Sequence, residues 1–194
     1  KVFHAVVFNG EQIDGLAPLP QPALTFQPVE EAEKVLVQGG VEIRHDQSDR
    51  AFYRMGSDRI HLPPKGAFKE GYEYYATALH ELGHALIGIN GVPFTGREED
   101  VADQFFMYVA AQNIEPRGAR VVLAAAWFFK ALSKQRDLSQ SGELSQVLAD
   151  EHSLDMQRTF NLACWAVGSG QEWGLVPAAY VGLPQQRAVR CGDE

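Results

Sequence analysis

Two histidines and a glutamate in the stretch 80–84 have the residue types and the spacing that metal-dependent hydrolysis needs. His80 and His84 are four residues apart, so on an α-helix both imidazoles lie on one face and can bind a single metal ion. Glu81 lies beside them, where a carboxylate can take a proton from an attacking water and return it to a leaving amine. The pattern predicts a hydrolytic site with one zinc ion per chain and Glu81 as general base. A solvated His-Glu-His helix face is the alternative.

The residues around this motif predict one helix. Residues 74–79 enter it without Gly or Pro, residues 85–87 continue it, and the pair Asn90-Gly91 is typical of a helix end. Gly83 has no side chain, so we expect a second helix to approach closely at this position.

A catalytic zinc ion normally has three protein ligands, so the two histidines need a third donor. The best candidate is Glu99, near the start of a segment with apolar residues at helical spacing after a Gly-containing loop. Asp103 follows one turn later and could accept the free N–H of a ligating histidine, which fixes the orientation of the ring. Because the loop from His84 to Glu99 is short, Asp103 stays open as the alternative ligand. The helix dipole alone explains the neighbouring Glu98 and Asp100.

Other histidines and other zinc patterns are weaker candidates. A third histidine six residues after His84 would be typical of a metzincin, but that position is Asn90, and the chain has no C-x-x-C pair. His152 lies among acidic residues near a helix start, where it could donate a hydrogen bond to a transition state; a surface role is the alternative. We interpret His45 and His61 as surface residues of strands.

The elements that must position these residues predict a single α+β domain over residues 1–194. The 45% of hydrophobic residues can bury one substantial core. Alternating segments at 41–45, 51–55 and 59–62 predict a small antiparallel sheet, and residues 2–8 predict a further strand.

Helices are expected at 29–38, around the motif, after Gly96 and from Gly118 to about Arg136. The aromatic residues of the fourth of these are assigned to the core: Trp127, Phe128 and Phe129. A last helix carries a stripe that we interpret as packing: Met156, Phe160, Cys164 and Val167.

Composition excludes some classes of function. The formal net charge of −8 argues against a phosphate-binding surface, so a nucleic-acid partner is not expected. No apolar run approaches the roughly 20 residues needed to span a bilayer. The sequence does not indicate an oligomeric state.

Two sets of segments resemble known families. From Val2 to about Leu86 the chain resembles the metallopeptidase domain of ArdC-type antirestriction proteins, through 7–16 (VFNGEQIDGL), 51–53 (AFY), 58–64 (DRIHLPP), Phe68 and 74–77 (YYAT). From His80 onward it resembles an uncharacterised bacterial family of metallopeptidases, through 96–100 (GREED), 124–128 (AAAWF), 150–155 (DEHSLD), Gln157, Arg158, Asn161, Cys164, Gly168, 183–184 (LP) and 190–191 (RC). Both resemblances imply a zincin, a fold in which the edge strand of the sheet runs beside the metal cleft.

Cys164 and Cys191 are the only cysteines, which permits one disulfide. We expect this bond because the two form the only pair and because the second family's resemblance favours it; a buried free thiol at Cys164 is the alternative. A bridge favours an extracytoplasmic compartment over the cytoplasm, which the first resemblance would suggest.

The sequence therefore predicts a zincin-like α+β metallopeptidase that hydrolyses peptide or protein substrates. Its zinc ligands are His80, His84 and Glu99, with Asp103 behind a histidine. A catalytically weak zincin-fold module that binds another protein, such as a restriction system, is the first alternative, and hydrolysis of a non-peptide amide is the second.

Overall fold

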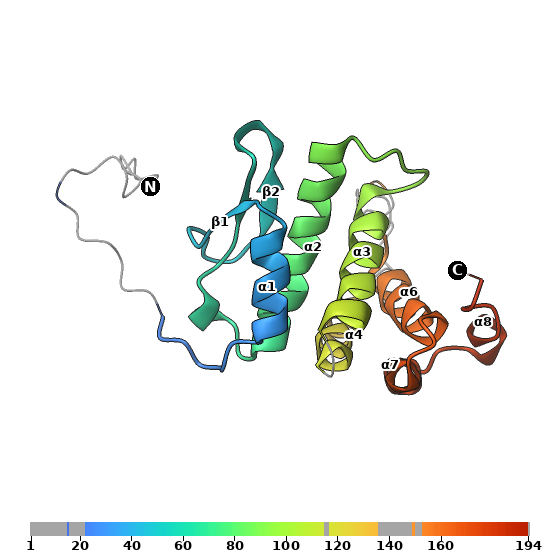
Figure 1. Ribbon diagram of the computed structural model, residues 1–194. Coiled ribbons are helices and arrows are strands. Elements are labelled where there is room, and N and C mark those ends of the chain that lie inside the picture. The colour runs from blue at the N-terminus through green and yellow to red at the C-terminus, as the bar shows by residue number, and fades with distance from the viewer. Residues whose placement is uncertain (1–14, 16–21, 115–116, 136–148, 150–152, 194) are drawn as a thin grey trace, which may run out of the picture.

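The computed structural model describes residues 15, 22–114, 117–135, 149 and 153–193 (Figure 1). The expected strand at 2–8 and His152 lie outside these residues. The described fold is α+β, with mostly helices and one three-stranded sheet. Its helices and strands are α1 (Glu30–Gln38), β1 (Glu42–Arg44), β2 (Phe52–Arg54), β3 (Arg59–His61), α2 (Gly71–Asn90), α3 (Glu98–Asn113), α4 (Gly118–Ser133), α6 (Asp155–Gly168), α7 (Leu175–Val181) and α8 (Gln185–Ala188).

The sheet is mixed, which corrects the prediction that it is antiparallel. The central strand β3 pairs antiparallel with β2 and parallel with β1. A short 3-10 turn at Met55–Ser57 and a left-handed Asp58 join β2 directly to β3, whereas β1 reaches the other side of β3 through a longer connection. The alternation of side chains showed which residues are extended, but it carries no information on which strands pair or in which direction.

A small polar network connects α1 to α2. The Tyr75 hydroxyl donates to Glu33 Oε1 at 2.6 Å and accepts from the backbone N–H of Val29 at 3.1 Å. Lys65 forms an ion pair with the same Glu33 carboxylate, and its ammonium lies over the buried ring of Tyr74. Because both tyrosines lie less than two turns before His80, this network fixes the first half of the motif helix.

Helix α2 carries the whole 80–84 motif and ends where the sequence predicts. The Glu73 side chain accepts the backbone N–H groups of Lys69 and Glu70 at its start. At its end Gly91 has φ of +57°, a left-handed conformation that favours glycine, and the N–H of Val92 bonds to the carbonyl of Ile87. These caps hold the two motif histidines within one unbroken helix.

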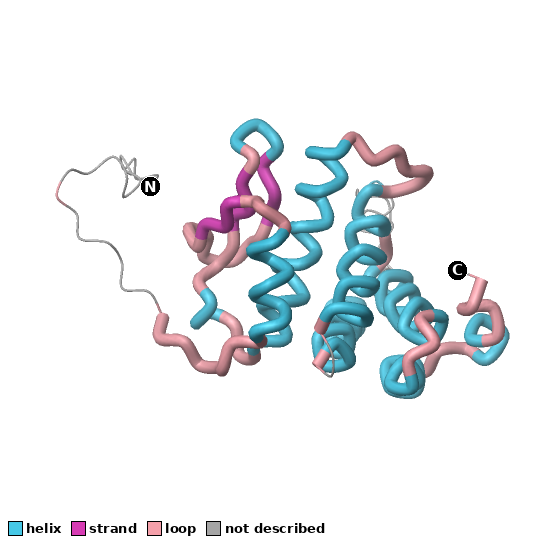
Figure 2. The backbone as a smooth tube through the Cα atoms, in the orientation of Figure 1, coloured by secondary structure: helices cyan, strands magenta, loops and turns pink. Residues whose placement is uncertain are grey.

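Helix α3 packs closely against α2 at Gly83, which confirms the expected approach of a second helix. A Cβ atom at Gly83 would lie 3.1 Å from Cα of Ala102 and 3.2 Å from Cδ1 of Phe105. Figures 1 and 2 show α2 between the sheet and α3, with α1 on the sheet side and α6 beyond α3. The close contact brings the start of α3 to the two motif histidines.

Helices α4 and α6 complete the core, but the expectation about α4 is wrong and the one about α6 holds only in part. Trp127 and Phe128 are about half exposed, not buried in the core. On α6 the buried face includes Arg158, Thr159 and Leu162, whereas Met156 and Phe160 of the expected stripe are only partly buried. Both helices are apolar around much of their circumference, so periodicity alone does not tell which face is covered.

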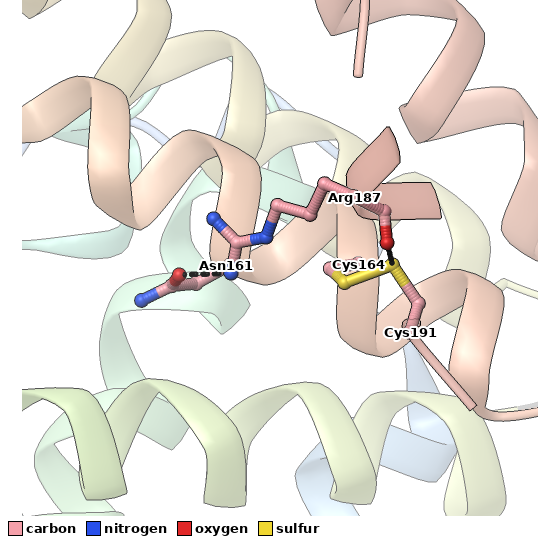
Figure 3. Close-up of a disulfide and its surroundings, with 4 residues drawn as sticks. All are labelled: Asn161, Cys164, Arg187 and Cys191. Carbon is pink, nitrogen blue, oxygen red and sulfur yellow. Dashed lines mark hydrogen bonds between the residues drawn. A yellow bond between two sulfur atoms is a disulfide. The ribbon is translucent and has the colours of Figure 1, made fainter. Parts of the chain in front are cut away.

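The C-terminal segment is fastened to α6. Cys164 and Cys191 form a disulfide, as the sequence predicts. Figure 3 shows a second connection beside it, in which Arg187 of α8 donates to the side chain of Asn161 at 2.7 Å. Both bonds hold the last helix against the helix that carries Arg158.

Candidate metal centre

The side chains of His80, His84 and Glu99 converge on one point between α2 and α3. The two Nε2 atoms lie 3.1 Å apart. Glu99 Oε2 lies 3.1 Å from Nε2 of His80, and Glu99 Oε1 lies 3.3 Å from Nε2 of His84. One donor atom from each residue lies within 4.8 Å of the others, and within the described residues this is the group of histidine and acidic side chains that could hold a metal ion. Two imidazoles and one carboxylate are a donor set typical of zinc.

Asp103 lies on the other side of the His80 ring, at Nδ1. Its Oδ1 atom is 2.9 Å from Nδ1, in a short contact that is bent away from ideal hydrogen-bond geometry. Both Asp103 oxygens also accept from Arg158 of α6, each at 2.7 Å. This ion pair is buried, with side-chain exposures of 8% for Arg158 and 3% for Asp103. Asp103 is thus held by two partners and faces away from the point on which the Nε2 atoms converge.

His84 has a corresponding carboxylate at its Nδ1 atom. Glu98 Oε1 lies 2.8 Å from this nitrogen. This contact corrects the expectation from the sequence that the helix dipole alone explains Glu98. Its neighbour Asp100 accepts a hydrogen bond from Ser153 at 2.8 Å, at the start of α6. Each motif histidine has a carboxylate on its Nδ1 side, the arrangement that fixes a ligating ring and leaves Nε2 for the metal.

Glu81 is buried, with 7% of its surface exposed. The backbone N–H of Tyr53 in strand β2 hydrogen-bonds to its carboxyl group, so the outer edge of β2 faces α2 at this residue. Burial raises the pKa of Glu81, and the positive charges of His80 and His84 oppose that rise. A carboxyl group with a raised pKa is suited to accept and return a proton near neutral pH.

The other ionisable groups of the site shift in opposite directions. Burial lowers the pKa of His80, but the carboxylates of Asp103 and Glu99 outweigh it and raise the pKa to about 9. The pKa of His84 is also raised, since Glu99 and Glu98 outweigh burial. The two imidazoles hold the pKa of Glu99 far below its usual value against the effect of burial. The local field thus favours positive charge between the histidines and Glu99.

A cavity of about 530 Å³ opens beside this group. His80, Glu81 and Asp103 contribute to its wall, and it extends between the loop before β2, the loop before α2, and helix α4. Its volume lies in the range of about 300–1,000 Å³ that is usual for ligand sites. The candidate base Glu81 is therefore accessible from a cavity large enough for a substrate side chain.

His45 and His61 lie apart from the metal-binding group. His45 Nε2 contacts the hydroxyl of the buried Tyr74 at 3.0 Å. His61 Nδ1 contacts the Asp46 carboxylate at 2.9 Å, and its ring stacks on Phe52. Both are partly covered, which corrects the expectation of simple surface residues.

Two contributors to the site, Arg158 and Glu98, were missed in the sequence. A signal for Arg158 was present, because it follows Asp155 by three residues and precedes Leu162 by four, and so lies on the buried face of α6. A charged residue on such a face requires a partner of opposite charge. The sequence could not identify Asp103 as that partner, because 55 residues separate the two.

Comparison with known proteins identifies the family. A family model described as "Putative metallopeptidase" matches residues 44–194. The chain belongs to this family. The matched region contains the motif on α2, the acidic start of α3 and Arg158 on α6, so all the residues of the candidate centre lie inside it.

Curated relatives match in two ways. Two proteins of Escherichia coli named DNA primase TraC are 58% identical over 84 residues and 56% identical over 85 residues; each match covers 43% of this chain but only 8% and 6% of the primase. Uncharacterized protein y4eC of Sinorhizobium fredii is 30% identical over 158 residues, which is 74% of this chain and 51% of that protein. The chain thus spans a small part of the primases and about half of y4eC. No solved structure matches it significantly. Among the described residues, no helix combines the length and hydrophobicity needed to cross a membrane.

Proposed function

We propose that the chain is a zinc-dependent metallopeptidase, with zinc held by His80, His84 and Glu99. The convergence of two imidazole nitrogens and a carboxylate within 4.8 Å carries this proposal. The donor set fits zinc in residue type and number, and three protein ligands leave a fourth position for chemistry. Membership of the "Putative metallopeptidase" family supports the same class of activity.

The surroundings of Asp103 favour Glu99 as the third ligand. Both oxygens of Asp103 are engaged by Arg158, and its carboxylate lies at Nδ1 of His80 rather than at Nε2. We infer that Asp103 orients His80 and stabilises its ligating tautomer, while Glu98 does the same for His84. Glu99 contacts both Nε2 atoms, with Oε2 at His80 and Oε1 at His84.

Zinc, when bound here, supplies Lewis acidity, which polarises a carbonyl group and lowers the pKa of a nearby water. Glu81 takes the proton of the attacking water on its carboxylate and passes it to the nitrogen of the leaving amine as the peptide C–N bond breaks. The hydrogen bond from Tyr53 orients the Glu81 carboxyl, and the buried position keeps bulk water from competing for the proton.

Zinc analysis combined with peptide hydrolysis tests this proposal. The purified chain should contain about one zinc per molecule and cleave members of a peptide library, and a chelator should stop the cleavage. Glu81→Gln should keep the zinc and lose the hydrolysis, because the amide has the same shape but does not accept the proton. The matched control is Glu172→Gln, a carboxylate in the short helix before α7, which should change neither property.

Two results would overturn the proposal. Zinc retained in full by both His80→Ala and His84→Ala would place the metal elsewhere. Zinc bound at this site without hydrolysis of any peptide would favour the alternative of a zincin-fold module that binds another protein.

A further inference from the structure

We propose that the cavity beside Glu81 selects a substrate with a large apolar side chain next to the cleaved bond, and that Trp127 and Phe128 form the wall that binds it. This inference rests on the proposed peptidase function and names its substrate class. It begins from the two aromatic residues of α4 that the sequence assigns to the core and the structure leaves exposed.

Trp127 and Phe128 are 50% and 51% exposed, and both line the cavity that also contains His80 and Glu81. Large aromatic side chains at a pocket wall lose contact with water when a ligand covers them, which is favourable by roughly 25 cal/mol per Å² of apolar area. Exposed aromatics elsewhere on the described surface, such as Tyr108 with 62% exposure, do not line this cavity.

The wall is rigidly connected to the candidate centre. The ring of Phe128 packs edge-on against Phe129, with centroids 5.4 Å apart. Phe129 in turn lies under the guanidinium of Arg158, at 3.9 Å from the ring centroid, and Arg158 holds Asp103. The aromatic wall and the support of His80 therefore form one continuous set of packed groups.

The space in front of this wall is open because the neighbouring side chains are small. Ala76 and Thr77 lie one helical turn before His80 and Glu81 on α2, and Ala124 and Ala125 face the cavity from α4. The opposite side carries the apolar residues Pro63 and Phe68, together with charged residues at its rim: Asp49, Arg50, Lys69 and Glu73. An apolar pocket that reaches the general base has room for the side chain of a residue that flanks the bond under attack, and it offers that side chain few hydrogen bonds.

Cleavage of paired peptides tests the inference. The probes are two blocked pentapeptides that contain four alanines and a central phenylalanine, or five alanines. Zinc-loaded protein should cleave the phenylalanine peptide beside the aromatic residue with a kcat/KM at least about 10-fold higher, since a well-filled apolar pocket discriminates by about 10–200-fold for each methylene. Trp127→Ala and Phe128→Ala should each reduce this preference, because they remove the aromatic wall. Ala124→Leu should also reduce it, because the larger side chain fills the pocket.

Tyr108→Ala is the matched control, because Tyr108 is an exposed aromatic of α3 outside the cavity, and its preference should equal that of the unaltered chain. Thermal unfolding of every variant separates a lost pocket from a lost fold. A binding measurement complements turnover: in Glu81→Gln, the phenylalanine peptide should change the tryptophan fluorescence, and the change should be absent in Glu81→Gln combined with Trp127→Phe.

The outcomes separate this inference from the proposed function. If no peptide is cleaved, the peptidase proposal fails, and the fluorescence titration alone decides whether the aromatic wall binds the apolar peptide. If peptides are cleaved but Trp127→Ala and Phe128→Ala keep the preference, or if the all-alanine peptide is the better substrate, the pocket assignment is wrong. If the unaltered chain is a dimer in solution and Trp127→Ala is a monomer with unchanged peptide preference, the wall is a contact between two copies and the inference is overturned.

Discussion

The buried ion pair of Arg158 and Asp103 should stabilise both the fold and the metal centre. Replacement of Arg158 by Met keeps much of the side-chain volume and removes the guanidinium. Asp103 would then stay buried, with 3% of its side chain exposed, and would lose two hydrogen bonds of 2.7 Å. The contact with His80 would be its remaining charged partner among those that the structure shows.

Removal of one partner from a buried ion pair typically costs about 3–5 kcal/mol, because the remaining charge is left uncompensated. For a chain of this size, about 1 kcal/mol corresponds to roughly 2–4 °C in Tm. Arg158→Met should therefore lower Tm by roughly 6–20 °C in the presence of a chelator. Zinc affinity should fall by about 10–100-fold, because the carboxylate behind His80 is no longer held in place.

The assay is thermal unfolding followed by circular dichroism, together with zinc titration against a competing chelator. The double variant Arg158→Met with Asp103→Asn removes both charges, so it should be more stable than Arg158→Met alone. Arg120→Met is the matched control, since this exposed arginine of α4 donates to the hydroxyl of Tyr72 and should change stability by no more than about 0.5 kcal/mol. A Tm of Arg158→Met within 2 °C of the unaltered chain, as an order-of-magnitude criterion, or a double variant less stable than the single one, would refute the reasoning.

Three further predictions concern the metal ligands, the packing of α3 on α2, and the disulfide. Glu99→Ala should lose zinc outright, whereas Asp103→Ala should weaken it by about 10–100-fold, as measured by competition with a chelator; the reverse order would make Asp103 the ligand. Gly83→Ala should lower the free energy of unfolding by about 1–3 kcal/mol in a urea titration, because its methyl group meets α3 at 3.1 Å; unchanged stability would show that α3 can move away at little cost. Intact mass should show that Cys164 and Cys191 are bonded, and their reduction should destabilise the chain by about 3 kcal/mol through the loop of 27 residues; two alkylatable thiols in protein made in an oxidising compartment would contradict this.

The parts of the site that the sequence predicts are local in the chain. His80 and His84 are on one helix, and the spacing of four residues suffices to place them on one face. The helix end at Gly91 and the close packing at Gly83 are likewise properties of single residues that allow few conformations or little bulk. Glu99 was found because a zinc ion needs a third donor and few carboxylates follow the motif closely.

The parts that the sequence does not predict depend on contacts between distant segments. The parallel pairing of β1 with β3 follows from the path of the intervening chain, and side-chain alternation is the same for either direction. Arg158 meets Asp103 only because α6 packs on α3, and Trp127 is exposed because the open side of α4 faces the cavity. Hydrophobic character alone does not distinguish a residue of the core from a residue of a pocket wall.

Location of the metal tests the central claim most directly. Crystals of the zinc-loaded chain, measured on both sides of the zinc absorption edge, give an anomalous difference map in which zinc is identified by element and position. We predict one strong peak per chain, bonded to Nε2 of His80, Nε2 of His84 and the carboxylate of Glu99, with Asp103 still paired to Arg158. A peak bonded to Asp103 in place of Glu99, or zinc bound only at other residues, would contradict it.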